Sequence, residues 1–208
     1  QEVPEIYDGI IEIRGIARDP GSKAKVAVYS RNETSDIIGA TVGIRGVRVQ
    51  AVTNELRGEK IDVIRWSENP VEYIVNAIAP AKPIKVIFNE EKNTADVVLS
   101  QDQLSLAIGR GGQNVKLASK ITGIKIDVMT EQDEKERRLT EFKEATKELM
   151  DILNVEEVIA QLLVVEGFDS IKTIAESSID SLKNIEGFDE EIAKELQERA
   201  IEYINEEK

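Results

Sequence analysis

Residues 43–63 read GIRGVRVQAVTNELRGEKIDV, and residues 109–128 read GRGGQNVKLASKITGIKIDV. Both stretches have glycine at their first and fourth positions, and both end in the string KIDV. The first glycines lie 66 residues apart and the KIDV strings 65 apart, so one residue has been gained or lost between them. Two such units are too few for a solenoid. We interpret them as a tandem duplication of one domain within the first 130 residues.

The same order of elements is predicted around both stretches. Asn69 before Pro70 is a typical helix start, because asparagine caps the first turn and proline suits the first helical position. The turn sequence DPGS at 19–22 lies between apolar runs and predicts a β-hairpin, and Ser100 with Gln103 predicts a capping box. The predicted elements are hairpin 10–29, helix 36–41, helix 47–56 and strand 61–66, then helix 71–79, hairpin 84–99, helix 101–108, a helix through 115–118 and strand 124–129.

The glycine-bounded loops are the candidate binding sites. Glycine at both ends of a four-residue turn lets the backbone approach a ligand without obstruction by a Cβ atom. The helix that follows presents free N–H groups and a partial positive charge, which suit a phosphate. Basic and apolar residues accompany both loops, as an extended single strand with readable bases would require. These residues are Arg45, Arg48, Arg110 and Lys116, with Ile44 and Ile108 as an apolar groove floor.

Other interpretations of the repeated stretches fit the residues less well. A single Gly-x-x-Gly is often only a turn that ends a helix, and it is the repetition that favours a site. A dinucleotide-binding fingerprint would need glycine where Asn114 stands, and the Gly-Lys-Ser/Thr of a P-loop is missing. The KIDV strings favour a structural role. In them Ile61, Val63, Ile126 and Val128 are expected in the core, with Asp62 and Asp127 as exposed strand residues rather than metal ligands.

Composition excludes several kinds of protein. The 208 residues include no cysteine and no histidine, so disulfides, Cys/His zinc sites, thiol nucleophiles and Ser-His or Cys-His relays are absent. No run approaches the ~20 apolar residues of a membrane span, and nothing pairs the carboxylates in an acid/base arrangement. We therefore expect a non-enzymatic protein with no catalytic residue, metal site or cofactor. The lack of cysteine fits a cytoplasmic protein, and the first residue, Gln1, indicates a fragment.

The last third of the chain differs in charge and pattern. Residues 1–130 hold 17 basic and 17 acidic side chains, whereas residues 131–208 hold 10 and 23, so the whole net charge of −13 lies there. VEGFD at 165–169 recurs as IEGFD at 185–189, which resembles a helix-hairpin-helix motif. Acidic residues surround both hairpins and would repel phosphates, and the glycines and phenylalanines are expected as turn formers and core residues. We expect an all-helical domain whose exposed acids, Glu190, Glu191 and Glu195, contact a basic or amphipathic protein surface.

The first two thirds resemble a known family. Helix, hairpin, helix, Gly-x-x-Gly, helix and strand is the order of a KH domain, and the helix-first order resembles the bacterial, type II form. Longer motifs resemble the NusA family of transcription factors: DPGS at 19–22, VGIRG at 42–46 with RVQAV at 48–52, AIGR at 107–110 and GQNV at 112–115.

The resemblance covers both units and has functional implications. It implies RNA binding during transcription elongation, termination and antitermination, in contact with RNA polymerase. The polymerase-binding N-terminal domain and the oligonucleotide-binding barrel of the family have no counterpart in these residues, which again indicates a fragment. Acidic repeats at the C-terminus of some members engage protein partners, and one such repeat is expected here.

These observations predict an α+β protein with two tandem type II KH domains, residues 1–68 and 69–130, and an all-α helix-hairpin-helix-like domain, residues 131–208. The short linker predicts a jointly packed pair with one continuous RNA track. Expected partners of the monomeric chain are single-stranded RNA and, by resemblance, RNA polymerase and antitermination proteins, with no membrane. The alternative is another tandem-KH protein, ribosomal or RNA-processing, although a ribosomal component would be strongly basic. The expected RNA-binding residues are Gly43, Ile44, Arg45, Gly46, Arg48, Ile108, Gly109, Arg110, Gly111, Gly112, Gln113, Asn114 and Lys116.

Overall fold

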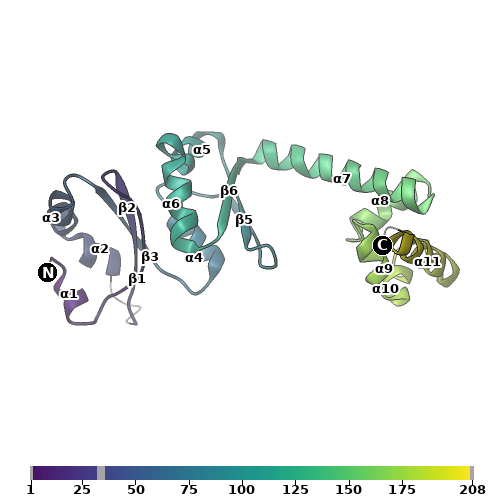
Figure 1. Cartoon of the computed structure of the whole chain (residues 1–208), viewed down its shortest axis with the longest axis horizontal. Coiled ribbons are helices and arrows are strands. Elements are labelled where there is room, and N and C mark those ends of the chain that lie inside the picture. The colour runs from purple at the N-terminus through teal and green to yellow at the C-terminus, as the bar shows by residue number, and fades with distance from the viewer. Residues whose placement is uncertain (1, 32–35, 207–208) are drawn as a thin grey trace. The chain divides into compact units, whose positions relative to one another are not determined.

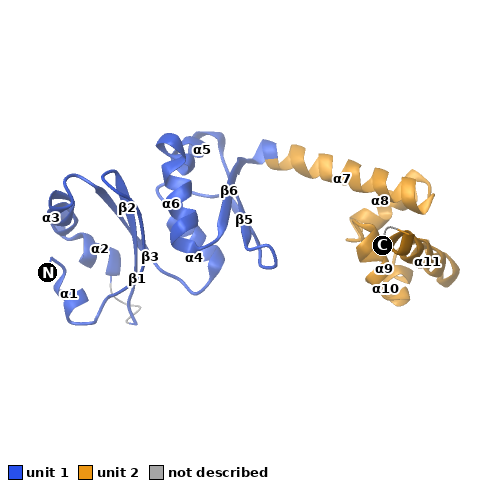
Figure 2. Cartoon of the chain, viewed as in Figure 1, with its two compact units in different colours: residues 1–133 blue, residues 134–208 orange. Residues whose placement is uncertain are grey.

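The structure is a computed structural model that describes residues 2–31 and 36–206. It divides into two compact units, residues 1–133 and 134–208, which Figure 2 shows in different colours. The first unit contains both copies of the duplication, called here the first repeat (residues 1–68) and the second repeat (residues 69–133). No helix among the described residues is long and apolar enough to cross a membrane.

The first repeat is a three-stranded sheet with helices on one side (Figure 1). Strands β1 (Glu12–Asp19) and β2 (Lys23–Tyr29) pair antiparallel across the predicted turn, and β3 (Lys60–Arg65) pairs parallel to β2. The helices are α1 (Pro4–Tyr7), α2 (Ile37–Val42) and α3 (Val47–Glu55). The predicted order is confirmed, except that the short helix α1 had no recognised signal.

The second repeat has the same topology. Helix α4 (Pro70–Ala77) precedes the antiparallel strands β4 (Lys85–Asn89) and β5 (Thr94–Leu99), and β6 (Lys125–Thr130) pairs parallel to β5. Helices α5 (Gln101–Ile108) and α6 (Gln113–Thr122) lie between β5 and β6. The predicted cap of α4 is confirmed, because the Asn69 side chain accepts the Val71 N–H at 2.9 Å. The predicted capping box at α5 is wrong: the Ser100 side chain makes no cap bond, and Gln103 donates to Asp102 instead.

The two repeats share a hydrophobic cluster at their junction, and the first repeat has a smaller cluster of its own around Ile11, Val28 and Ile37. Ala27 and Ile64 of the first sheet lie in the same buried cluster as Ile74 and Ala77 of α4. Gly15 of β1 has no side chain, and a Cβ atom there would lie 3.2 Å from the Tyr73 hydroxyl oxygen of α4. The open face of the first sheet is therefore covered by helices of the second repeat, which Figure 1 shows beside it. A shared buried cluster of this kind differs from the more polar contact expected between independent domains joined by a linker.

The last unit is all-helical, as predicted. After α7 (Glu131–Leu153) follow α8 (Glu157–Val165), α9 (Ile171–Glu176), α10 (Ile179–Lys183) and α11 (Glu190–Glu206). Its core is a cluster of eleven buried apolar residues, against which both hairpin phenylalanines pack. Gly167 and Gly187, the glycines of the two hairpins, have φ of +90° and +88°, so their predicted role as turn formers is confirmed. Helix α10 is capped by the Ser178 side chain, whose hydroxyl accepts the Ser181 N–H at 3.1 Å.

Candidate nucleic-acid interface

The two glycine-bounded loops have the same backbone geometry. Loop 1 (residues 43–46) joins α2 to α3, and loop 2 (residues 109–112) joins α5 to α6. The first glycines have φ/ψ of 78°/168° and 72°/176°, which is a region open almost only to glycine. The last glycines, Gly46 and Gly112, are left-handed and stand at the N-cap of the following helix. The repeat in the sequence is thus a repeat of one loop conformation, which the spacing alone did not prove.

The first glycine of each loop also makes room for the residue five positions later. A Cβ atom on Gly43 would lie 2.8 Å from Cγ of Arg48, and one on Gly109 would lie 2.8 Å from Cβ of Asn114. The side chain in the first turn of α3 or α6 therefore folds back over the loop. Arg48 and Asn114 occupy equivalent positions in the two repeats. The sequence alone does not indicate this correspondence, because the two side chains differ in chemistry.

Exposed arginines stand at the tips of both loops. Arg45 and Arg110 are exposed, and within the described part of the chain neither guanidinium has a hydrogen bond or an ion pair. Ile44 beside Arg45 is 86% exposed, and Val47 in the first turn of α3 is 67% exposed. An apolar surface next to a free cation and the start of a helix can accept a base and a phosphate together.

A groove runs beside loop 1. It has a volume of about 580 Å³ and is lined by α1, α2, the loop and the start of α3. Arg48 lies in its wall, where its guanidinium is paired with the Glu5 carboxylate at 2.8 Å and hydrogen-bonded to the Ala40 carbonyl. The Glu5 backbone N–H and the Arg48 side chain hold the pKa of the Glu5 carboxyl below its usual value. The charge of Arg48 is thus partly offset, which leaves Arg45 as the freer cation of this loop.

Two of the residues expected to contact RNA are used inside the protein. Asn114 is 3% exposed, and its Nδ2 donates to the Ile78 carbonyl at 2.9 Å and to carbonyls at the end of α5. Gln113 is directed at the first repeat, with Nε2 at 2.6 Å from Asp19 Oδ2 and 2.7 Å from Ser22 Oγ. Because a buried amide that is already bonded to carbonyls is not available to a strand, we withdraw Asn114 as an RNA contact.

The other predicted loop residues lie at the surface or close to it. Gly111 and Lys116 are exposed, and Lys116 Nζ donates to the Gly111 carbonyl at 3.3 Å. Ile108 is half-buried at the end of α5, so only part of it borders the loop. Each loop therefore gathers its glycines, one exposed arginine and an apolar edge in one place.

The acids expected to contact a partner lie together at the start of α11. Glu190, Glu191 and Glu195 are all exposed. Glu190 contacts Lys194 at 2.7 Å and Lys183 at 3.3 Å, and these two hydrogen-bonded ammonium groups lower the pKa of its carboxyl. Glu195 pairs with Arg199. Of the three, Glu191 is thus the one whose carboxylate has no ion pair within the described ranges, 2–31 and 36–206.

Comparisons with known proteins place both repeats. A sequence model of the NusA-like first KH domain matches residues 1–66, and that of the NusA-like second KH domain matches residues 70–136. The chain is 53% identical over 207 residues to the transcription termination/antitermination proteins NusA of Rickettsia conorii and Rickettsia prowazekii. The match covers 98% of this chain and 41% of each relative. A solved structure described as "Crystal structure of APE1850" matches 62% of this chain and 94% of its own, with a TM-score of 0.45 and 21% identity.

Proposed function

Because this chain belongs to the NusA family, we propose that it binds single-stranded RNA through loops 1 and 2 as part of a transcription termination and antitermination factor. The observation that carries the proposal is the pair of loops with one backbone geometry, each with an exposed arginine at its tip. The chain spans less than half the length of the relatives, so the activity proposed here is that of one part of a longer protein.

The binding mechanism follows from the loop geometry. Left-handed glycines at the N-caps let a phosphate approach the first N–H groups of α3 and α6 without meeting a side chain. Arg45 and Arg110 supply the positive charge at these points. Bases of the same strand then lie on the exposed apolar edge, which Ile44 and Val47 form at loop 1. Double-stranded nucleic acid does not fit this arrangement, because its bases are stacked and paired.

The helical unit serves a protein partner in this proposal. Its acidic surface repels RNA and attracts basic or amphipathic protein surfaces. In this family such a partner is RNA polymerase or an antitermination protein. The groove between α7 and α8 combines apolar residues, Phe142 and Val164, with the acids Glu141, Glu144 and Glu148. This combination fits a partner that presents basic and apolar side chains together.

We further propose a non-catalytic protein that acts where bacterial transcription takes place, in the cytoplasm. A different tandem-KH protein, ribosomal or RNA-processing, is disfavoured because both matched domain models are those of NusA. Binding of nucleic acid by the helix-hairpin-helix-like part is disfavoured by the glutamates around its hairpins.

The test compares RNA affinity of residues 1–133 with that of the whole chain at matched salt. We expect equal or tighter binding by the shorter chain, because the deletion removes a repulsive field and no RNA contact. The measurement is fluorescence anisotropy with a labelled single strand, titrated at two salt concentrations. A clear loss of affinity on truncation would make the helical unit an RNA-binding element and contradict this division of roles.

A further inference from the structure

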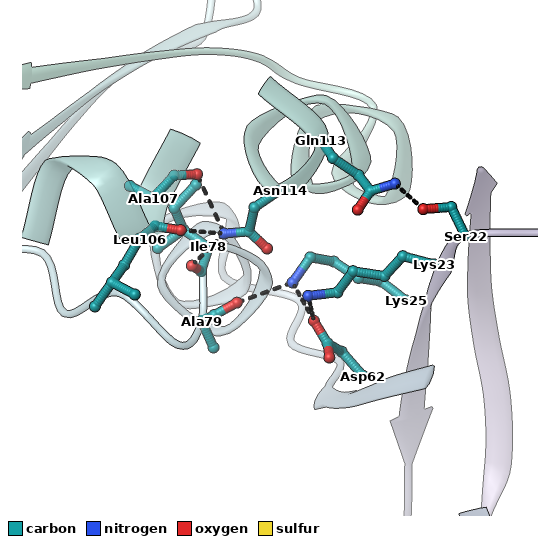
Figure 3. Close-up of polar contacts among 10 residues, drawn as sticks. All are labelled: Ser22, Lys23, Lys25, Asp62, Ile78, Ala79, Leu106, Ala107, Gln113 and Asn114. Carbon is teal, nitrogen blue, oxygen red and sulfur yellow. Dashed lines mark hydrogen bonds and ion pairs between the residues drawn. The ribbon is translucent and has the colours of Figure 1, made fainter. Parts of the chain in front are cut away.

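A lysine is buried at the junction of the two repeats. Lys25 of β2 is 0% exposed, and its Nζ lies 3.2 Å from Asp62 Oδ2 and 2.9 Å from the Ala79 carbonyl oxygen (Figure 3). Desolvation lowers the pKa of Lys25, and the nearby Asp62 carboxylate opposes this shift. A buried ammonium is unfavourable unless it is paired and hydrogen-bonded. Its partners come from both repeats, so the full set of contacts exists only when the repeats are docked.

Further contacts connect the site of Lys25 to loop 2. Ala79 follows the end of α4, and the carbonyl of the preceding residue, Ile78, accepts the hydrogen bond from Asn114. Asn114 in turn packs against Gly109, the first glycine of loop 2. Two successive carbonyls are thus held from two sides, by Lys25 of the first repeat and by the first turn of α6.

A second contact fixes the same turn of α6. Gln113 donates to Asp19, the last residue of β1, and to Ser22 in the turn that follows (Figure 3 shows the bond to Ser22). That turn is held by Glu59, whose carboxylate receives two hydrogen bonds from Arg18 at 2.8 Å and one from the Gly21 N–H at 3.1 Å. Gln113, the residue directly after loop 2, is therefore hydrogen-bonded to a part of the first repeat that Glu59 stabilises.

The lysine pair is specific to the junction. Lys25 pairs with Asp62 in the register of β2 and β3, and the equivalent positions of β5 and β6 are Asp96 and Asp127. Asp127 is exposed, as predicted, whereas the prediction of an exposed Asp62 is wrong, since it is half-buried against Lys25 and Lys23. The two KIDV strings look equivalent, but Asp62 of the first pairs with a lysine at the junction of the repeats, whereas Asp127 of the second is exposed.

We propose that Lys25 and Gln113 are positioning residues that fix loop 2 relative to loop 1, so that a strand long enough to contact both loops binds with full affinity. This inference rests on the RNA binding proposed above. A KH domain contacts about four nucleotides. When two sites are held at a fixed separation, binding at one raises the effective concentration of the strand at the other. A flexible junction between the repeats lowers this gain in effective concentration, while the affinity of each separate loop for RNA stays the same.

The RNA experiment uses strands of about 5 and about 20 nucleotides, one for a single loop and one for both. Lys25→Met, which is similar in size, is compared with Lys92→Met, an exposed lysine in the turn between β4 and β5. We expect Lys25→Met to weaken binding of the long strand about fivefold and to leave the short strand and the control unchanged. A second variant, Asp19→Ala with Ser22→Ala, removes both acceptors of Gln113 from an exposed turn and should have the same effect.

A distance measurement tests the positioning without RNA. The chain has no cysteine, so Glu55→Cys and Glu91→Cys place one spin label on an exposed site of each repeat. Pulsed electron paramagnetic resonance measures the distance between the two labels. We expect a narrow distribution of this distance in the otherwise unchanged chain and in Lys92→Met, and a broad distribution in Lys25→Met. Narrow distributions in every variant, or equal losses for short and long strands, would overturn the inference. If the unchanged chain bound no RNA at all, the proposed function would be wrong. The label-to-label distances would still show whether Lys25 fixes one repeat relative to the other.

Discussion

The conformation of loop 2 requires glycine at position 109. Its φ of +72° and ψ of 176° suit glycine alone, and a Cβ atom there would meet the backbone nitrogen of Asn114 at 2.9 Å. Gly109→Ala should therefore destabilise the first unit by about 2 kcal/mol. Urea unfolding followed by circular dichroism measures this difference.

A neighbouring glycine provides the matched control. Gly111 has φ of +59° and open space where a Cβ atom would lie, with nothing within 4 Å, and Arg45 adopts the same left-handed conformation in loop 1. Gly111→Ala should cost about 1 kcal/mol, the usual penalty for a side chain in this region. Equal losses for the two alanine variants would show that crowding by Asn114 is unimportant.

At the scale of elements, the turn between β1 and β2 depends on Glu59, which is 1% exposed. Hydrogen bonds from Arg18 and then from the Gly21 N–H lower the pKa of Glu59 from 4.5 to about 2. A carboxyl with a lowered folded-state pKa contributes stability above its unfolded pKa, and that contribution is lost as the pH falls toward the folded value. The turn, and the Gln113 contact on it, should therefore weaken in acid.

The test measures urea midpoints of the chain and of Glu59→Gln between pH 7 and pH 2. We expect Glu59→Gln to be less stable at pH 7, with a difference that shrinks as the pH falls from 4.5 toward about 2. Glu91→Gln, at an exposed turn, serves as the control and should follow the parent chain. A difference between Glu59→Gln and the parent that stays constant down to pH 2 would contradict this role.

Most elements could be predicted because their signals are local. Asn69 and Pro70 start α4, DPGS closes the first hairpin, and the repeated glycines delimit both loops. The junction could not be predicted in the same way. Gln113 and Ser22 are 91 positions apart, and Lys25 and Ala79 are 54 apart, so no periodicity or motif relates them. For the same reason the sequence predicts Asn114 as an RNA contact, although the residue is buried and bonded to carbonyls at the ends of α4 and α5.

At the scale of the whole molecule, charge is divided between the units. The first 130 residues are neutral overall, and the last 78 hold the excess of negative charge. With few cations at the loops, RNA binding should depend only weakly on salt, because the slope follows the number of phosphates neutralised. Recognition of the strand therefore relies on loop geometry and base contacts more than on a general positive field.

The most direct test of RNA binding by the loops alters both loop tips at once. The variant carries Ile44→Asp, Arg45→Asp, Arg110→Asp and Gly111→Asp, all at exposed positions where folding should survive. Negative charge then stands where phosphates are proposed to lie. We predict that affinity for a long single-stranded RNA falls at least about tenfold, or about 1.4 kcal/mol, with an unchanged circular dichroism spectrum. An unchanged affinity in the folded variant would contradict the proposal that these loops bind RNA.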